Sequence, residues 1–377
     1  MTTRTDLVLV YAPVGAGHKM AALSTAEAAR RRGLVVEVLD LFEHAPRVVG
    51  QSYVAAHLTG QRVVPDLYGS AYFAANRRDG VLEPVRRGFD HMAFAGLVKR
   101  VAELAPRAVV ATHHLPLVVL GRARRRGDLA APLVGVVTDY TAHACWAEKG
   151  VDAFCVACPR AARDLVGHGV ARQSIVVTGI PVRRAFETIA DVRAAAPGEP
   201  LRVLVTSGGF GVGPVRAVVR SFAWLEGVAL TVVCGDAPRM ITRVVKDAAA
   251  FGVRANVLGF ERDMPARIAE AHVVVGKAGG LTVSETMTAG RPMVIVGAVP
   301  GNETLNAAMV VRAGAGYVAK SAHVGPLTLW MQRSGVVREM GRRARELVVA
   351  RSAERVIDVA MELVGARAGA ESASDAA

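Results

Sequence analysis

The strongest constraint on the fold is the alternation of short valine-rich segments with longer segments of helical character. Segments that predict strands run at about 7–12, 34–41, 107–112, 133–138, 152–157 and 174–178, and then at about 201–206, 229–234, 254–258, 272–276 and 292–296. Most are apolar at every position, as in strands that are covered on both faces. Strands that alternate with helices build parallel sheets, so the sequence predicts an α/β fold with two doubly wound domains.

The break between the two series predicts the domain boundary. The stretch from about 183 to 200 ends in Pro197-Gly-Glu-Pro200 and then restarts with a strand, which is typical of a linker. We expect an N-terminal domain over 1–185, a C-terminal domain over 186–365 and a ligand cleft that both domains face. The tail 366–377 is rich in Ala, Ser and Gly, and we expect it to be disordered.

Residues 45–95 interrupt the alternation and contain no clear strand. One interpretation of this insertion is a helical subdomain that packs on the sheet. The other is a basic, aromatic surface that touches a bilayer. The residues behind the second interpretation are Tyr53, Tyr72, Phe73 and Phe89 with Arg77, Arg78, Arg86 and Arg87.

The net charge is +13, from 46 Lys and Arg against 33 Asp and Glu, and many arginines form clusters. A basic surface suits nucleic acid, anionic lipid or a phosphorylated ligand, and the alternative is a solvated arginine-rich surface. No nucleic-acid-binding motif is present, so we expect no such partner. The sequence offers neither a signal peptide nor an apolar run long enough to span a bilayer, and it predicts a cytoplasmic protein.

Gly15-Ala-Gly17-His18 follows the first predicted strand and opens a helix. Glycines there permit a tight turn and a close approach of backbone to ligand. The dinucleotide fingerprint requires a third glycine where this chain has Met20, although Asp40 stands where that fold binds a ribose. A helix N-terminus disfavours the imidazolium, so we expect a neutral His18 that can act as a general base.

Polar and aromatic residues follow two further N-terminal strands. Thr138-Asp139 ends one strand and is followed by His143 and Trp146, and His113-His114 ends another. These side chains can hold a hydroxylated or amphipathic acceptor; the alternative is a capping aspartate and a core tryptophan. No ligand spacing supports a metal site, and we expect none.

The C-terminal half carries two glycine-rich turns between a strand and a helix. Gly208-Gly209 lies in the first, and Gly279-Gly280 precedes a helix that opens at Leu281-Thr282. Backbone N–H groups at such a helix start can bind a diphosphate. Lys277 can assist if its side chain turns inward. Glu285, one turn into the helix, is placed to accept hydrogen bonds from ribose hydroxyls.

The loop after the next strand offers Asn302, Glu303 and Asn306 to sugar hydroxyls. Each of these residues alone can be explained by capping or solvation. Together with the glycine-rich turns, on successive strand ends, they favour a nucleotide-sugar site.

These motifs resemble those of the monogalactosyldiacylglycerol synthases and processive diacylglycerol glucosyltransferases and, more distantly, the peptidoglycan lipid-intermediate N-acetylglucosaminyltransferase. The matching stretches are GAGHKMAA, VVTDYTAHACW, VTGIPV, GKAGGLTVSE and PGNETLN, and the resemblance covers about residues 7–350. It implies a GT-B fold and an inverting transfer of a hexose from a UDP-sugar to a lipid hydroxyl, with diacylglycerol as the expected acceptor. It implies neither a metal nor another cofactor.

The resemblance also implies a role for each matching residue. His18 or Asp139 is the base, and Gly17, His143 and Trp146 lie on the acceptor side. The implied donor side consists of Gly208, Gly209, Phe260 near the uracil, Lys277, Gly279, Gly280, Leu281, Thr282, Glu285, Asn302, Glu303 and Asn306. The family usually has Gln where this chain has Asn302, which leaves the identity of the sugar open.

The expected partners are a UDP-hexose, a lipid acceptor and the anionic inner face of the cell membrane. Two alternatives remain at this point. One is a glycosyltransferase that acts on a soluble natural product, and the other is a non-catalytic nucleotide-sugar binding protein.

Overall fold

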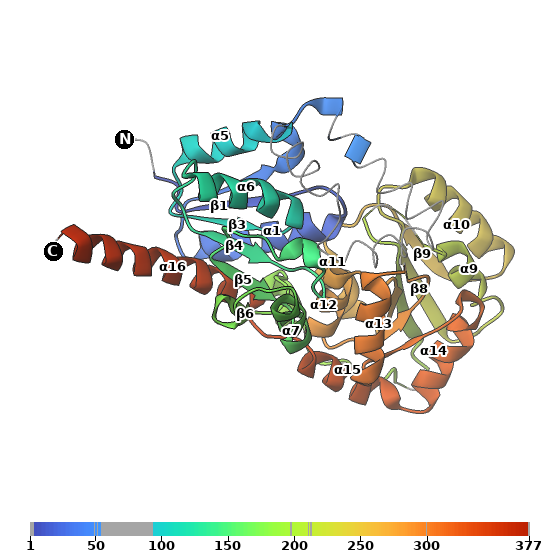
Figure 1. Cartoon of the computed structure of the whole chain (residues 1–377). Coiled ribbons are helices and arrows are strands. Elements are labelled where there is room, and N and C mark those ends of the chain that lie inside the picture. Colours follow the sequence, from blue (N-terminus) through green and yellow to red (C-terminus); the bar gives the residue numbers. More distant parts are fainter. Residues whose placement is uncertain are drawn as a thin grey trace. The chain divides into compact units, whose positions relative to one another are not determined.

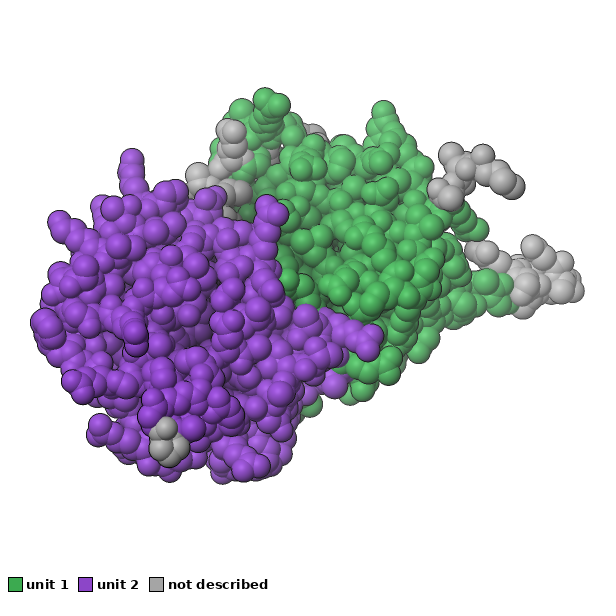
Figure 2. Space-filling model, turned by 180° about the vertical axis from the view of Figure 1, so that it is seen from behind, with its two compact units in different colours: residues 1–183, 351–377 green, residues 184–350 purple. Residues whose placement is uncertain are grey.

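The computed structural model describes residues 4–48, 50, 52–53, 93–196, 198–209, 211, 213–298 and 300–375. The chain divides into two compact units, residues 1–183 with 351–377 and residues 184–350 (Figures 1 and 2). Each unit contains one six-stranded sheet in which all neighbouring strands are parallel. The predicted α/β class is confirmed, and within the described residues we find no helix that is both long and apolar enough to span a bilayer.

The sheet of the first unit has the order β2-β1-β3-β4-β5-β6. Its strands are β1 (Leu7–Tyr11), β2 (Val36–Asp40), β3 (Ala108–Ala111), β4 (Leu133–Val136), β5 (Ala153–Val156) and β6 (Ile175–Val177). Its helices are α1 (Ala16–Arg31), α5 (Ala95–Leu104), α6 (His114–Arg126), α7 (Pro159–Gly167) and α16 (Ser352–Asp375), with the short η1 (Leu41–His44), η2 (Ala144–Trp146) and η3 (Arg172–Ser174). All six strands predicted for this half are present.

Alternate residues of β1 belong to two separate cores, because successive side chains of a strand point to opposite faces. Leu7 and Leu9 pack in the core formed with α1 and α16. Val8 and Val10 pack in the core formed with α5, α6 and α7. Helices on both faces therefore explain why this strand is apolar throughout.

Helix α16 returns the end of the chain to the first unit and corrects two expectations. The segment up to 365 was expected in the C-terminal domain, and 366–377 was expected to be disordered. Residues 351–377 instead belong to the first unit, and α16 extends to Asp375. The physical reason is an apolar stripe that includes Val356 and Ile357, both fully buried against the first unit, followed by alanine-rich sequence with high helix propensity.

Ion pairs at the edge of this contact join α1 to α16. Arg31 contacts Glu354 at 2.7 Å, and Arg32 contacts Asp358 at 2.6 Å. One arginine cluster that the sequence offered as a candidate binding surface therefore has carboxylate partners inside its own unit. Such exposed pairs contribute little to stability, so the apolar stripe carries the contact.

The sheet of the second unit has the order β12-β11-β10-β7-β8-β9. Its strands are β7 (Leu201–Thr206), β8 (Val228–Val233), β9 (Ala255–Leu258), β10 (Val273–Gly276), β11 (Met293–Ile295) and β12 (Gly316–Val318). Its helices are α8 (Arg184–Glu187), α9 (Val215–Arg220), α10 (Pro238–Ala250), α11 (Met264–Glu270), α12 (Gly280–Thr288), α13 (Asn302–Arg312), α14 (Val324–Arg333) and α15 (Val336–Glu346), with η4 (Ser321–His323). The sequence predicted five of these strands but not β12, which is three residues long and lies in a glycine-rich stretch.

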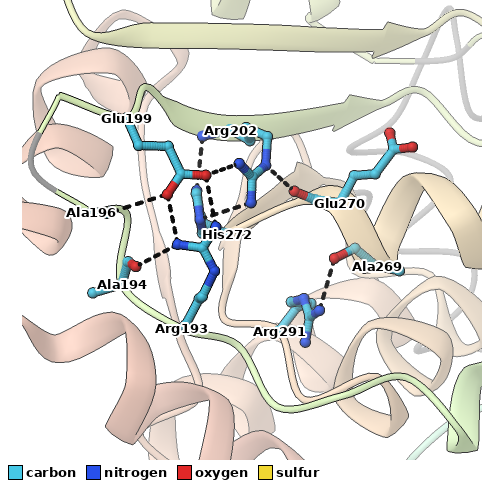
Figure 3. Close-up of polar contacts among 9 residues, drawn as sticks. All are labelled: Arg193, Ala194, Ala196, Glu199, Arg202, Ala269, Glu270, His272 and Arg291. Atoms are coloured by element: carbon cyan, nitrogen blue, oxygen red, sulfur yellow. Dashed lines mark hydrogen bonds and ion pairs between the residues drawn. The ribbon is translucent and has the colours of Figure 1, made fainter.

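Most of the segment expected to be a linker is anchored to the second unit by charged groups (Figure 3). Glu199 accepts two hydrogen bonds from Arg193, at 2.6 and 2.8 Å, and a further one from Arg202. The bonds from Arg193 and Arg202 hold the pKa of the Glu199 carboxyl well below its usual range. His272, just before β10, accepts from the backbone N–H of Arg202 at 2.9 Å, and burial lowers the pKa of His272 to about 4.

The insertion at 45–95 lies largely outside the described residues. Of the aromatic and basic side chains predicted to touch a bilayer, only Tyr53 is described. Its ring lies 5.7 Å from that of Phe42 and packs against the core of the first unit. For Tyr53 the prediction of a bilayer contact is therefore replaced by a packing contact.

We predict that Ile357→Ala lowers the free energy of unfolding of the first unit by about 2–4 kcal/mol, because it removes a fully buried side chain of α16. The control Glu354→Gln, which breaks an exposed ion pair, should cost less than about 1 kcal/mol. Urea unfolding followed by the fluorescence of buried Trp146, with Trp224 and Trp330 replaced by Phe, reports on the first unit. Equal losses for the two variants would contradict the assignment.

Candidate active site

The strand order of the first sheet defines where its ligand site lies. The chain runs from β1 outward to β2 and then continues on the other side of β1 with β3. Open α/β sheets bind ligands outside the carboxyl ends of the strands at such a reversal. His18 follows β1, and Thr112 and His113 follow β3, so the reversal brings them to one edge of the sheet.

Two threonines orient the ring of His18. Its Nδ1 lies 2.8 Å from the carbonyl oxygen of Thr112 and 2.9 Å from Oγ1 of Thr138. A carbonyl oxygen only accepts, so the contact with Thr112 assigns the proton of the neutral ring to Nδ1 and makes Nε2 the basic nitrogen. The hydroxyl of Thr112 in turn donates to the carbonyl of His18 at 2.8 Å, which fixes the first turn of α1 to the end of β3.

Two further histidines extend this group, and we call His18, His113 and His114 the histidine cluster. The ring of His113 lies 4.5 Å from that of His18, edge to face, and 4.1 Å from that of His114. His113 is buried, and its Nδ1 accepts the N–H of Leu115 at 3.1 Å, so its neutral ring carries the proton on Nε2. The sequence offered His113-His114 only as side chains at a strand end that can hold an acceptor, and it did not identify Thr112 as a group that orients His18.

The remaining acceptor-side predictions have mixed outcomes. Gly17 lies beside His18 in the first turn of α1, and Asp139 is half-buried in the loop after β4. Trp146, however, is 4% exposed and packs in the core. His143 is buried and accepts the N–H of Cys145 at 3.1 Å. In this structure Trp146 and His143 therefore build the loop, and their predicted contacts with the acceptor stay predictions.

The second sheet has its own reversal, between β7 and β10. Both glycine-rich turns follow these two adjacent strands, as the sequence predicted. Gly208 adopts a φ of 69°, and its N–H bonds Oγ1 of Thr206 at 3.2 Å. A Cβ added at Gly235, after β8, would lie 2.5 Å from the carbonyl oxygen of Gly208 and 2.7 Å from that of Gly209. Glycine at 235 therefore lets the two loops approach each other.

Helix α12 begins at the second turn without a side-chain cap. Gly279 is its N-cap residue in an extended conformation and makes no side-chain cap bond to the first N–H groups of the helix. Unbonded N–H groups at a helix start attract an anion. Ser284 is buried and its hydroxyl donates to the carbonyl of Gly280 at 2.9 Å, so it supports the helix. Thr282 and Glu285 are half-buried, whereas Leu281 is buried at 8% exposure.

An ion pair joins the second turn to α13. The ammonium of Lys277 lies 3.1 Å from Oε1 of Glu303, and both side chains are largely buried. A Cβ added at Gly213 would lie 3.8 Å from Cγ of Lys277, so the lysine stem runs past the first glycine-rich turn. Lys277 therefore places a cation close to both turns of the second unit.

The other predicted donor-side residues differ in exposure. Asn302 is the first residue of α13 and is half-buried, and Phe260 is 62% exposed two residues after β9. Asn306 has no exposed surface, and its amide donates to the carbonyl of Ala278 at 3.0 Å. This bond lets Asn306 position the loop after β10, and its predicted contact with the sugar stays a prediction.

The described residues contain no group of three His, Cys, Asp or Glu side chains that could hold a metal ion. Asp40, the residue that a dinucleotide site would use for a ribose, caps η1 by accepting the N–H of Phe42 at 2.9 Å. Burial raises the pKa of the Asp40 carboxyl. Its capping role accounts for an acid at this strand end without a dinucleotide.

Solved structures share this fold. MurG from Acinetobacter baumannii matches with a TM-score of 0.62 at 20% identity, over 95% of this chain and 99% of that chain. CalG4, the calicheamicin glycosyltransferase, matches with a TM-score of 0.60 at 15% identity, over 96% and 100%. Two parallel six-stranded sheets with these neighbours define the GT-B class of glycosyltransferases.

Family models and curated relatives narrow the class. Residues 18–182 match the model described as monogalactosyldiacylglycerol (MGDG) synthase, and residues 202–355 match the glycosyltransferase family 28 C-terminal domain. A Bacillus licheniformis protein named processive diacylglycerol beta-glucosyltransferase is 25% identical to this chain, over 84% of both chains. A Bacillus cereus protein of the same name is 24% identical, over 85% of this chain and 83% of the relative. The predicted resemblance to the monogalactosyldiacylglycerol synthases and processive diacylglycerol glucosyltransferases is therefore confirmed, and the chain is a glycosyltransferase.

We predict that the neutral ring of His18 carries its proton on Nδ1, because only that form donates to the carbonyl of Thr112. A long-range ¹⁵N–¹H NMR spectrum distinguishes the two tautomers, and the peaks lost in His18→Gln identify the ring. A spectrum with the proton on Nε2 would contradict the arrangement. His113, with the opposite assignment, serves as the internal control.

Proposed function

We propose that this glycosyltransferase moves a hexose from a UDP-sugar to the hydroxyl of a lipid, diacylglycerol, with inversion at the anomeric carbon. The acceptor class is supported by the names of the relatives and by the family model of the first unit. The observation that carries the chemistry is the orientation of His18, whose Nδ1 is bound to the carbonyl of Thr112 at the reversal of the first sheet.

In this proposal His18 acts on the acceptor. Nε2 takes the proton of the acceptor hydroxyl while the oxygen attacks the anomeric carbon. The bond from that carbon to the diphosphate oxygen breaks as the new bond forms, so UDP leaves with the bonding electrons. One such displacement inverts the configuration. Asp139 follows Thr138 directly, and its carboxylate is suited to stabilise the imidazolium that His18 becomes, so we assign the base to His18.

The second unit holds the donor in the proposal. The uncapped N–H groups of α12 and the ammonium of Lys277 offset the charge that develops on the leaving diphosphate, so the step needs no metal ion. Glu285 accepts from the ribose hydroxyls, and the exposed ring of Phe260 covers the uracil. Glu303 and Asn302, at the start of α13, bind the hexose hydroxyls.

The expected site of action is the inner face of the cell membrane. Diacylglycerol resides in the bilayer, so a peripheral enzyme has to reach it from the aqueous side. The protein would bind this surface reversibly while it draws its nucleotide donor from the cytoplasm.

The experiment that tests the proposal incubates the purified protein with a panel of UDP-hexoses, diacylglycerol in detergent micelles and EDTA, with products identified by mass spectrometry. A glycosyl-diacylglycerol of β configuration from an α-linked donor supports it. Transfer to soluble hydroxylated compounds alone would contradict the lipid acceptor. Activity that returns only when magnesium or manganese replaces EDTA would contradict metal independence.

We predict that His18→Gln lowers kcat at least about 100-fold, the usual contribution of a general base, and changes UDP affinity less than twofold. Glutamine retains a hydrogen-bonding side chain of similar length but accepts no proton at neutral pH. Single-turnover kinetics and calorimetric titration with UDP measure the two quantities. Near-normal turnover in this variant would show that another group acts as the base.

We predict opposite effects for the two partners of the ion pair in the second unit. Lys277→Met should weaken UDP binding about tenfold or more, because it removes a charge-assisted contact to the diphosphate. Glu303→Gln should strengthen UDP binding severalfold, since the carboxylate no longer competes for the ammonium. Calorimetry with UDP in EDTA measures both. If the two variants weakened UDP binding equally, the pair would be a structural contact only.

A further inference from the structure

The outer face of α10 carries an unusual row of cations. Arg239, Arg243 and Lys246 are spaced by four and three residues, so they project from one side of the helix, and all three are exposed. Within the described part of the chain none of the three has a hydrogen bond or an ion pair. In α15, by contrast, Arg342 and Arg343 both pair with Glu339 on the same helix.

The carboxylate of α10 does not offset this row. Asp247 is 7% exposed and faces α9, where it accepts from Arg216 at 2.7 and 3.0 Å and from Arg220 at 3.2 Å. The arginines of α9 therefore neutralise Asp247 on the inner side of the helix. Helices α9 and α10 lie side by side in the second unit (Figure 1), and the side of α10 away from α9 remains positively charged.

Trp224 lies just beyond the end of the same helix. A Cβ added at Gly252, two residues after α10 ends, would be 3.0 Å from the indole ring of Trp224. The ring is nevertheless 76% exposed, and its residue has a φ of 60°. A large apolar side chain loses free energy in this left-handed conformation, which glycine adopts readily. The contact with Gly252 leaves most of the ring exposed, so packing within the second unit accounts for little of this tryptophan's surface.

Exposed charges of both signs lie near Trp224 and Gly252 along the chain. Arg254 is exposed and follows Gly252 by two residues, and its side chain has no hydrogen bond or ion pair among the described residues, whereas Glu226, two residues after Trp224, supplies one exposed carboxylate. A surface that combines several unpaired cations with one projecting indole matches an anionic bilayer. Cations are attracted to its charge, and indole rings settle at the level of its headgroups.

We propose that the outer face of α10 together with Trp224 is a docking surface for anionic lipid. This inference rests on the proposed function, because a lipid acceptor is what brings the protein to a bilayer. Here α10 lies along the headgroups through Arg239, Arg243 and Lys246, and Trp224 inserts its ring. A nucleic acid would also bind the cations, but its binding does not explain why a single indole projects outward.

The first test is sedimentation with vesicles that contain phosphatidylglycerol and phosphatidylcholine. The triple variant Arg239→Gln, Arg243→Gln and Lys246→Gln should reduce the vesicle partition coefficient at least tenfold at low salt, and wild-type binding should fall as salt rises. The matched control replaces three other exposed cations of the second unit, Arg312, Arg333 and Arg338, with Gln. Equal losses in the two triple variants, or none in either, would overturn the proposal.

The second test uses Trp224→Gly, whose two effects have opposite signs. The melting temperature should rise, because glycine fits the backbone conformation at 224, while vesicle binding should fall several-fold. A purely structural tryptophan would lower the melting temperature when it is lost. Unchanged vesicle binding in this variant would show that Trp224 is not part of the docking surface. Binding of wild type to a single-stranded oligonucleotide but not to vesicles would overturn the lipid assignment.

Activity in detergent micelles separates this inference from the proposed function. All variants of α10 and Trp224 should keep wild-type turnover with micellar diacylglycerol, because none of these residues belongs to the active site. On anionic vesicles the α10 triple variant should be slower than its matched control. Wild type that binds vesicles through α10 but glycosylates no diacylglycerol would refute the proposed function and leave the docking surface standing.

Discussion

Parallel strand pairing is the constraint on which the rest of this structure depends. Because all strands of a sheet point the same way, their carboxyl ends meet at one edge, and residues that are distant in sequence become neighbours there. His18 and Thr112 are 94 residues apart, yet they exchange two hydrogen bonds at that edge. In the second unit the same geometry places the glycine-rich turns beside each other and brings Lys277 to Glu303.

The sequence predicted those features that are encoded by local pattern. Eleven of the twelve strands follow from apolar segments, and the glycine turns follow from spacing. What it missed depends on tertiary contact. Trp146 and Asn306 have residue types that suit a ligand, yet both are buried in the fold, and their burial depends on the elements that cover them. The sequence also did not predict that α16 packs on the first unit, because the composition of its apolar stripe suits either sheet.

Charge illustrates the same limit. A net charge of +13 suggested a binding surface in several arginine clusters, yet Arg31 and Arg32 pair with carboxylates of α16 that lie over 300 residues later. Among the described residues, the arginine clusters at 30–32 and 124–126 are therefore largely paired within the fold. The cations of α10 are separated by other residues and attract no notice in the sequence, but the helix gathers them on one face. The charges that remain available to a partner are therefore identified by their ion pairs in the fold and not by their clustering in the sequence.

The return of α16 also has a consequence for synthesis on the ribosome. The second unit is one continuous segment, residues 184–350, so all of its strands are available before the chain is finished. The first unit precedes it but obtains Val356 and Ile357, part of its core, only from residues translated after the whole of the second unit. Vectorial synthesis therefore completes the second unit before the first. Until α16 is synthesised, this face of the nascent first sheet is covered by α1 alone, and a chain truncated after residue 350 would leave the part that α16 covers permanently exposed.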